Sequence, residues 1–410
     1  MYKKFTKVIE DNIDEDDFTR SSIENFGHQI KLYDRDEKEN LDLFCYVDCN
    51  NKDTKTVKKC RGLVYNGDKL IMNAFPFTPD YDCKDVEEYK DLIDFDKCSF
   101  FNAHEGTLIR VFNFNGKWYT STHRKFNSWN SKWSGKQTFG KAFEEALEYH
   151  ERTNKEFQEL LSASASASAE EGISVLHKFY STLNPEYQYM FLVVSSSDNR
   201  IVCASPENPT VYHVGTFVDG DLTFDKNPDT CIPAPKQHKF RNLDELRHYV
   251  DNCDYNSIQG VLVFAPNNKQ FKIVNTQYFK LYKVRGNEPS IKFRYLQVRN
   301  DKDMVEDLKG LYPHMIESFD RYEKNIQTLA KRIHGSYISR FIKKEFTTVS
   351  QTQFKIIKEC HSWHLENREQ NRVNQQKVID VINNQTATHI NHMIKELESE
   401  SVSLISSYES

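Results

Sequence analysis

The chain has 410 residues, of which 38% are hydrophobic and 28% charged, so it can bury real cores and is not a disordered chain. This length fits two or three domains. The formal net charge of −5 excludes a uniformly basic nucleic-acid coat, so any nucleic-acid partner would have to be met by a local basic patch. The N-terminus lacks the apolar run of a signal peptide, and no stretch approaches the roughly 18 apolar residues of a membrane span. Nine cysteines without a CxxC pair are typical of a reducing compartment, so we expect a cytoplasmic protein with no membrane partner.

The first 300 residues read mostly as short strands and turns. Residues 61–65 run into the hairpin signal Asn-Gly-Asp, and residues 108–114 and 117–121 flank an Asn-Gly turn. Residues 139–161 carry apolar side chains at helical spacing, which predicts a helix. The alternating Ser-Ala tract at 162–169 cannot form a packed core, so we expect a surface linker or insertion there.

Further along, the pattern predicts a helix over 170–183 and then a strand pair, 189–195 with 200–204, joined by a turn at Asp198-Asn199. A second strand pair is expected at 260–265 and 270–274.

The pattern changes towards the C-terminus. From about Asp303, Gly and Pro nearly vanish and apolar residues recur every three or four positions. The sequence therefore predicts an α+β fold, with antiparallel sheets in a domain over 1–300 and an all-helical domain over 301–410.

Five short motifs carry the functional signal, and each is weak alone. In chain order they are Lys59-Cys60-Arg61-Gly62, Ala103-His104-Glu105-Gly106-Thr107, Asp198-Asn199-Arg200-Ile201-Val202, Gln259-Gly260-Val261 and Phe271-Lys272-Ile273-Val274. Their order and spacing over about Thr56 to Lys283 resemble the ATP-dependent RNA ligases of the phage RNA ligase 1 family, relatives of the ligase domain of fungal tRNA ligase.

The resemblance implies an ATP-grasp-like nucleotidyltransferase domain with antiparallel sheets around a cleft, followed by a helical domain that handles RNA. It also implies ATP and Mg²⁺ as cofactors and a role in RNA repair. In such enzymes a lysine attacks the α-phosphate of ATP, the adenylate passes to an RNA 5′-phosphate, and a 3′-hydroxyl displaces AMP. Carboxylates hold the metal and the ribose, and further lysines neutralise the phosphates.

Several positions that this chemistry needs have changed. The nucleophile position is Ala103, the acid positions are Val193 and Gln259, and the second lysine of the Lys-x-Lys pair is Val274. The family's lysine after a Phe-Pro pair is Phe77 here. The nearest upstream lysine, Lys97, is about 20 Å of extended chain away and cannot simply substitute. All these changes remove charge, which favours natural loss of ligation over a single engineered substitution.

The matching residues that remain would line a remnant nucleotide pocket: Arg61, His104, Glu105, Gly106, Thr107 and Lys272. Three hypotheses follow. The first is an inactive pseudo-ligase that binds nucleotide, RNA or a protein partner. The second is an active ATP-dependent RNA ligase with a displaced nucleophile or an alteration at Ala103. The third is a scaffold, with Ala103, Val193 and Val274 packed together in the former pocket.

Two basic clusters are candidate RNA contacts. The first comprises Lys331, Arg332, Arg340, Lys343 and Lys344, interleaved with Tyr337 and Phe341. The second is Arg124 and Lys125, near where the family carries a further lysine. A solvated helix face and a surface cluster are the respective alternatives.

No metal site is predicted. Cys360, His361 and His364 lack a matching second pair of ligands, and Cys45 and Cys49 fit no zinc or redox motif. Buried thiols and partly exposed histidines are the better interpretation of both groups.

Overall fold

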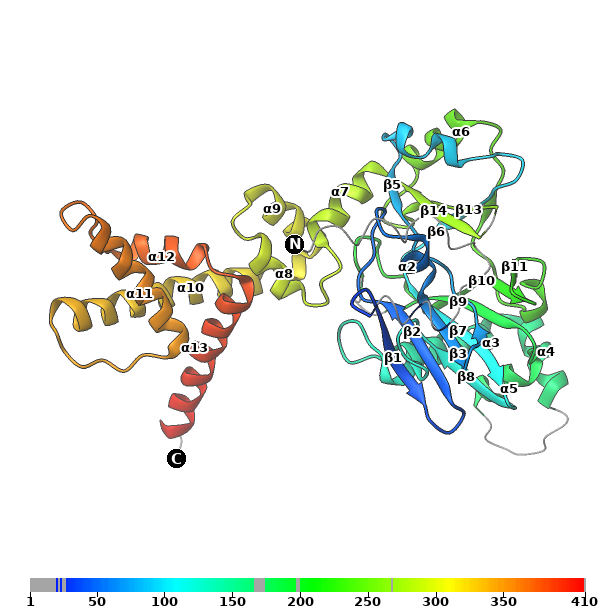
Figure 1. Ribbon diagram of the computed structural model, residues 1–410, viewed down its shortest axis with the longest axis horizontal. Helices are drawn as coiled ribbons and strands as arrows, with labels where there is room; N and C mark the ends of the chain where they lie inside the picture. The colour runs from blue at the N-terminus through cyan, green and yellow to red at the C-terminus, as the bar shows by residue number, and fades with distance from the viewer. Residues whose placement is uncertain are drawn as a thin grey trace, which may run out of the picture. The chain divides into compact units, whose positions relative to one another are not determined.

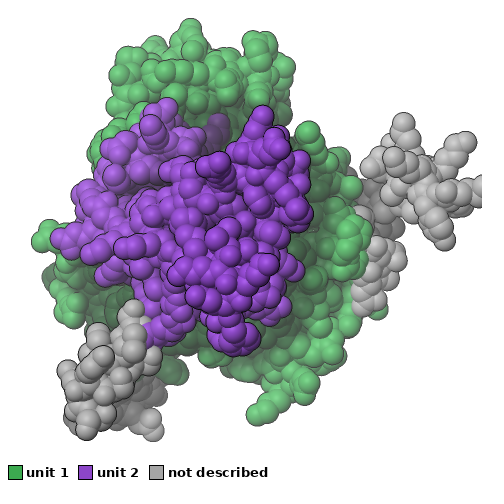
Figure 2. Space-filling view, turned by 90° about the vertical axis from the view of Figure 1, so that its left-hand side faces the viewer, with its two compact units in different colours: residues 1–279 green, residues 280–410 purple. Residues whose placement is uncertain are grey.

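The computed structural model describes Arg20, Ile23 and residues 27–165, 174–196, 200–266 and 268–408. The chain divides into two compact units, Met1–Phe279 and Lys280–Ser410, which Figure 2 colours separately. We call them unit 1 and unit 2. This division falls earlier in the chain than the expected boundary after residue 300, and the predicted extents of the functional domains stay a prediction.

The described residues of unit 1 form three sheets (Figure 1). The first, in spatial order, is β1 (Ile30–Asp36), β2 (Leu41–Tyr46), β3 (Arg61–Asn66) and β4 (Lys69–Met72). The second is β11 (Asp221–Thr223), β10 (Thr210–Val218), β9 (Gln188–Val194), β7 (Thr107–Phe114) and β8 (Lys117–Ser121). The third is β12 (Gln237–His238), β6 (Ser99–Ala103), β13 (Gly260–Ala265), β14 (Lys269–Val274) and β5 (Asp80–Asp82).

The helices and short helical turns of unit 1 connect and cover these sheets. The α-helices are α2 (Lys55–Lys59), α3 (Phe139–Thr153), α4 (Lys155–Ala165), α5 (Val175–Thr182) and α6 (Leu243–Asn252). The 3₁₀ turns are η1 (Val86–Glu88), η2 (Lys90–Leu92), η3 (Ser128–Asn130) and η4 (Pro228–Thr230). The α+β class with antiparallel sheets is confirmed, apart from one parallel pair, β14 with β5. The predicted hairpins β3–β4, β7–β8 and β13–β14 are confirmed as well.

The second sheet is covered on both faces, and side-chain alternation along its strands assigns each residue to a face. Phe191 and Val193 of β9 belong to the core that α3, α4 and α5 form against this sheet. Met190 belongs to the other core, which joins the second sheet to the first and third. Helix α6 packs against the third sheet through Leu246 and Val250.

Three predictions about local structure need correction. Residues 200–204 form no strand, because the amides of Ile201 and Val202 bond to a carboxylate instead of to a neighbouring strand; β9 pairs with β7 and β10. The helix expected over 139–161 is two helices, broken at Asn154, whose side chain accepts a bond from the Phe157 amide (2.9 Å).

The Ser-Ala tract is also partly different from the expected linker. Its first residues extend α4 as far as Ala165, in keeping with the high helix propensity of alanine. Residues 166–169 of the tract lie outside the described residues, as do Asp198 and Asn199 of the predicted turn and the first residues, 170–173, of the helix expected over 170–183.

Unit 2 is helical, as the sequence predicts for the C-terminal part. Its elements are α7 (Thr276–Arg285, which begins in unit 1), α8 (Ile291–Val298), α9 (Lys302–Leu311), η5 (Pro313–Met315), α10 (Ile316–Tyr337), the π-helical turn η6 (Ile338–Ile342), α11 (Gln351–Glu366), α12 (Gln375–Asn383) and α13 (Ala387–Tyr408). The apolar spacing that predicts these helices buries Phe319 of α10 and Ile356, Ile357 and Cys360 of α11. No helix in the described part of the chain is long and apolar enough to cross a membrane.

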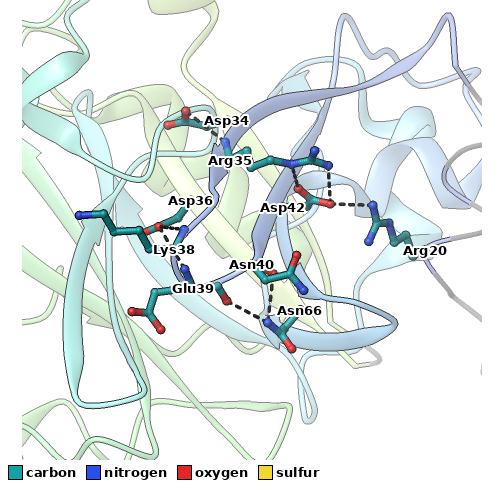
Figure 3. A network of polar contacts seen from close by, with 9 residues as sticks. All are labelled: Arg20, Asp34, Arg35, Asp36, Lys38, Glu39, Asn40, Asp42 and Asn66. Atoms are coloured by element: carbon teal, nitrogen blue, oxygen red, sulfur yellow. Dashed lines mark hydrogen bonds and ion pairs between the residues drawn. The ribbon is translucent and has the colours of Figure 1, made fainter.

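A polar network secures the β1–β2 hairpin of the first sheet (Figure 3). The buried Asp42 carboxylate accepts bonds from Arg35 (2.5 Å) and pairs with Arg20 (2.8 Å). At the end of β1, the Asp36 carboxylate accepts bonds from Lys117 Nζ (2.6 Å) and Tyr119 Oη (2.8 Å) of the second sheet. These contacts tie the first sheet to the second.

The Asp36 contacts predict a pH dependence of stability. The hydrogen bond from Lys117 is the main reason that the pKa of Asp36 falls to about 2. Because the pKa is lower in the folded state, the ionised Asp36 stabilises the fold at pH values above its unfolded-state pKa of about 3.9. This stabilisation is lost as the pH falls towards 2. We expect Asp36→Asn to lower the free energy of unfolding by about 1 kcal/mol at neutral pH, since solvent screens part of the charge, and by less near pH 3. Thermal melts at both pH values test this, with the exposed Asp68→Asn as control; a difference between wild type and Asp36→Asn that does not shrink near pH 3 would contradict it.

Candidate nucleotide site

The matched positions of the third sheet form one connected group. Ala103 ends β6, is 3% exposed and lies opposite Gly260 of β13. Its carbonyl accepts a bond from the Gln259 amide (2.8 Å). The Gln259 side-chain oxygen in turn accepts a bond from Lys272 Nζ (2.8 Å), and Lys272 pairs with Asp80 of β5 (2.9 Å). The position that the resemblance assigns to the nucleophile, Ala103, is therefore connected through Gln259 to a lysine that Asp80 neutralises.

The remaining residues of the Ala103–Thr107 motif are tied to other parts of unit 1. The Glu105 carboxylate accepts bonds from the amides of Ile201 (3.0 Å) and Val202 (2.7 Å). The His104 ring stacks on Tyr212 with centroids 4.7 Å apart, and burial lowers its pKa. Glu105 thus fixes the loop after β9, with each of its two oxygens bonded to one backbone amide.

The β9 side chain that lies beside the Ala103–Thr107 motif is not the one that the sequence suggests. Val193, counted as an acid position, is 3% exposed and packs in the core beneath α3, α4 and α5. Leu192 points to the opposite face, as strand alternation requires. A Cβ added at Gly106 would lie 3.0 Å from the Leu192 Cγ, so Leu192 is the β9 side chain beside the motif.

The three small apolar residues of the scaffold hypothesis do not pack as one cluster. Val193 lies in the helix-covered core. Ala103 and Val274 lie on either side of Gly260, in register with it on β6 and β14. Two strand spacings, about 10 Å, separate their backbones. The specific packing that the scaffold hypothesis invokes is therefore absent from the described residues.

Arg61 and Lys272 border the same segment, residues 76–80. Arg61 Nη1 lies 3.4 Å from the Pro76 carbonyl and 3.5 Å from Thr78 Oγ1. Gln270, two residues before Lys272 on β14, donates to the same two oxygens at 3.2 and 2.9 Å. The structure therefore brings together Arg61 and Lys272, predicted from two separate motifs.

Arg61 belongs to a cluster of cations that the motif comparison did not include. Arg110, in the middle of β7, is fully buried and donates to the Gly62 carbonyl and to the Thr122 carbonyl (2.7 Å). Arg124 donates to the carbonyls of Tyr46 (3.3 Å) and Val47 (3.0 Å), and its guanidinium lies over the Tyr33 ring, 4.6 Å from the centroid. We call Arg61, Arg110 and Arg124, together with His123, the arginine cluster.

Tight backbone packing holds this cluster together. Gly62 has φ of +98°, and a Cβ there would lie 2.7 Å from the His123 Cα and 2.8 Å from Arg110 Nη1. Only glycine fits such a close approach in that conformation. The Arg-Gly pair of the sequence therefore places Arg61 beside the loop that carries His123 and Arg124.

No acid of the described ranges compensates the charge of the arginine cluster. Among the described residues, no carboxylate forms an ion pair with Arg61, Arg110 or Arg124, and their printed partners are carbonyl and hydroxyl oxygens or an aromatic ring. Burial and, to a lesser extent, the positive charges of the three arginines lower the pKa of His123 to about 3, so the histidine is neutral at neutral pH. Burial lowers the pKa of Arg110 to about 10, which still leaves it charged at neutral pH. Three positive charges without an acid are the chemistry of an anion site.

The residues present do not fit a catalytic divalent metal. Carboxylate oxygens are the ligands that Mg²⁺ requires from a protein. The Glu105 carboxylate is bound by two amides and Asp80 by Lys272, while the two predicted acid positions hold valine and glutamine. Within the described ranges, no group of three or more His, Cys, Asp or Glu side chains is arranged to hold a metal ion.

The other candidate positions have partners of their own. The sequence suggests a strand at Lys97, but this residue lies in the turn before β6; its side chain is 70% exposed and it pairs with Asp94 (3.0 Å). Thr107 opens β7 opposite Val193, and Lys125 pairs with Asp34 (3.6 Å).

The basic cluster of unit 2, Lys331, Arg332, Arg340, Lys343 and Lys344, which we call the basic stripe, divides into two parts. Arg332 pairs with Glu400, whereas Arg340, Lys343 and Lys344 form no ion pair with a described residue. Lys331 is exposed on α10. His361 stacks on Phe341 with centroids 3.8 Å apart, and His364 bonds to the Asn371 carbonyl (2.6 Å), so both rings have partners other than a metal.

Sequence reasoning missed Arg110, His123, Asp80 and Leu192. A signal existed for Arg110, because a lone arginine stands in the otherwise apolar run of 108–114. The other three had none, since their roles depend on which strands become neighbours.

Comparisons with known proteins were made on the sequence and on the fold. No family model matches the sequence. The "Immediate-early protein ICP-46 homolog" of Invertebrate iridescent virus 6 is 28% identical over 413 residues, which cover 95% of this chain and 86% of that protein. The "Putative bifunctional polynucleotide kinase/RNA ligase" of Autographa californica nuclear polyhedrosis virus is 24% identical over 277 residues, 65% of this chain and 36% of that protein. Among solved structures, the "Putative ATP-dependent DNA ligase from Aquifex aeolicus" has a TM-score of 0.40 at 9% identity, covering 72% of this chain and 77% of that one.

The chain is thus similar to proteins that are named as ligases and to viral proteins that are not. The first similarity agrees with the ligase resemblance of the motifs at a coarse level. The narrower assignment to the phage RNA ligase 1 family stays a prediction.

Proposed function

We propose that this chain is an RNA-ligase-like protein of the phage RNA ligase 1 type that binds the phosphates of a nucleotide or of an RNA end and does not form a lysyl-adenylate. Ligation requires an amine at the nucleophile position, and the side chain there is the methyl group of Ala103. Without that amine the covalent lysyl-adenylate cannot form at this position, so we expect ligation to be lost and not merely slowed.

The observation that carries the binding half of the proposal is the arginine cluster. Transfer of arginine charge into a buried site costs free energy that an anion offsets. Phosphate matches the planar donor fork of arginine and accepts several bonds at once. Arg61 also contacts the segment that ends at Asp80, the ion-pair partner of Lys272, so the arginine cluster borders the residues around Lys272. An RNA partner agrees with the name of the relative from Autographa californica nuclear polyhedrosis virus.

Incubation with α-labelled ATP and Mg²⁺ separates this proposal from the second hypothesis, an active ligase. The wild-type chain should acquire no acid-labile label, and a labelled protein would contradict the proposal. Lys97→Ala addresses a displaced nucleophile, because loss of label in that variant alone would identify Lys97 as the attacking amine.

Nucleotide affinity is the second expected result. Titration with ATP and with a 5′-phosphorylated oligoribonucleotide should show binding, and Arg61→Ala and Arg124→Ala should each weaken it about tenfold or more, the usual cost of removing a charged hydrogen bond. Lys69→Ala, an exposed lysine of β4, serves as the control that keeps wild-type affinity.

Absence of binding by the wild-type chain would favour the third hypothesis, a scaffold, and would contradict the proposal. Equal affinity in the arginine variants would show that the ligand binds elsewhere. RNA repair and a cytoplasmic location stay predictions.

A further inference from the structure

The segment after α10 exposes apolar side chains among cations. The side chain of Ile342 is 66% exposed and that of Phe346 is 96% exposed. Arg340, Lys343 and Lys344 alternate with them along the chain, and Glu345 is the one acid in this stretch. The segment begins within the π-helical turn η6 and continues on the loop that leads to α11 (Figure 1). An aromatic ring almost fully in water has no role in packing this unit.

A fourth cation joins the segment from α11. The Arg340 guanidinium lies 4.8 Å from the centroid of the Phe354 ring, and Lys358 Nζ lies 5.5 Å from the same centroid. Among the described residues, neither of them forms an ion pair, nor do Lys343 and Lys344, which differs from Arg332 and its partner Glu400. We call Arg340, Lys343, Lys344, Phe346 and Lys358 the loop patch.

The backbone of the segment has two uncommon features. Residues Ile338–Ile342 form a π-helical turn, which is rare and is found often at functional sites. Lys344 has φ of +60°, the left-handed region that a lysine seldom adopts. These turns end the helix and direct the following residues into solvent.

The composition of the loop patch favours single-stranded nucleic acid over a protein as its partner. A stable protein interface buries about 800 Å² on each side, with a contiguous apolar centre. Here two exposed apolar side chains are separated by two lysines and a glutamate, which is too small and too charged for such a centre. Binding of single-stranded nucleic acid needs the opposite pattern: an isolated aromatic ring that stacks on a base, and cations that contact the neighbouring phosphates.

We propose that the loop patch binds single-stranded nucleic acid, with Phe346 stacked on an unpaired base and Arg340, Lys343, Lys344 and Lys358 in contact with the flanking phosphates. The proposal depends on unit 2 alone and stands whether or not the arginine cluster binds nucleotide. It also assigns different roles within the basic stripe, since Arg332 is already paired and takes no part.

Fluorescence anisotropy with the full chain and a labelled oligouridylate of about 12 nucleotides tests the proposal. Phe346→Ala should weaken binding about tenfold, and Phe346→Trp should preserve it, since both aromatic rings stack on a base. Lys343→Glu with Lys344→Glu should weaken binding further and reduce the slope of log K against log salt by about 1.4. Lys302→Glu, a single charge reversal at an exposed lysine at the start of α9, is the control for a change of charge elsewhere in unit 2 and should keep near-wild-type affinity.

The outcomes separate the alternatives. Duplex RNA should bind more weakly than the single strand, and equal binding of the two would overturn base stacking. Unchanged affinity in Phe346→Ala, with an unchanged melting temperature, would overturn the role of the ring. If Phe346→Ala abolished binding to a purified protein partner while RNA affinity stayed the same, the loop patch would be a protein-docking surface and the proposal would be wrong.

Discussion

Placing a lysine at position 103 is expected to leave the chain unable to adenylate itself. The new amine would replace a side chain that is 3% exposed, in a group that already contains Lys272 and whose carboxylates, on Glu105 and Asp80, are occupied. Loss of one catalytic electrostatic contact costs about 3 to 4 kcal/mol in the barrier, so two such losses lower turnover by about 10⁴-fold or more. Label transfer from α-labelled ATP to Ala103→Lys measures this directly.

Two further variants make the result interpretable. Ala103→Met has a side chain of similar length without an amine, so it shows whether bulk at this position disturbs folding. Strong adenylation of Ala103→Lys, with none in Ala103→Met, would contradict the expectation. It would show that Ala103 is the only residue that prevents adenylation, and would support the hypothesis of a ligase altered at that position but otherwise active.

The structure changes what a fuller repair requires. The sequence alone suggests that Ala103→Lys with Val193→Glu, Gln259→Glu and Val274→Lys would recover some adenylation. Val193 lies in an apolar core, however, and an unpaired carboxylate there costs several kcal/mol. Leu192 is the β9 residue beside the motif, so Leu192→Glu places a carboxylate closer to the motif than Val193→Glu does.

The parts of the fold that follow from local chemistry could be predicted from the sequence. The Asn66-Gly67 and Asn115-Gly116 turns produce the hairpins β3–β4 and β7–β8, with positive φ at Gly67 (+57°) and Gly116 (+79°). The apolar spacing after residue 303 produces helices because one face of each is buried.

Contacts between distant segments could not be predicted. Residues 200–204 have the apolar composition of a strand, yet two of their amides bond to Glu105, about 96 positions upstream, and this contact replaces strand pairing. Counting residues along the chain placed an acid position at Val193, but a one-residue difference on a strand moves a side chain to the other face. The sequence motifs therefore identify the strands of the candidate site more securely than the side chains that face it.

Replacing Gly260 by alanine is expected to lower the free energy of unfolding of unit 1 by about 3 kcal/mol or more. Gly260 has φ of +146°, which a residue with a side chain rarely adopts, and an added Cβ would lie 2.2 Å from the Ile273 carbonyl oxygen. That oxygen belongs to the backbone of β14, so it cannot move without disturbing the pairing of Gly260 with Val274 and of Val261 with Ile273. Protection of the β13 and β14 amides from hydrogen exchange reports this loss in unit 1 separately from unit 2.

Gly220→Ala is the matched control, because it separates backbone conformation from steric contact. Gly220 also has a positive φ, +91°, but no heavy atom lies within 4 Å of an added Cβ. If the two variants lost equal protection, the close approach of β14 would not matter and conformation alone would explain the cost. A larger loss in Gly260→Ala means that β13 and β14 must approach closely at the point where Gln259 receives the Lys272 bond. The glycine of the Gln259-Gly260 pair would then be required by the geometry of the sheet, whatever residue occupies position 259.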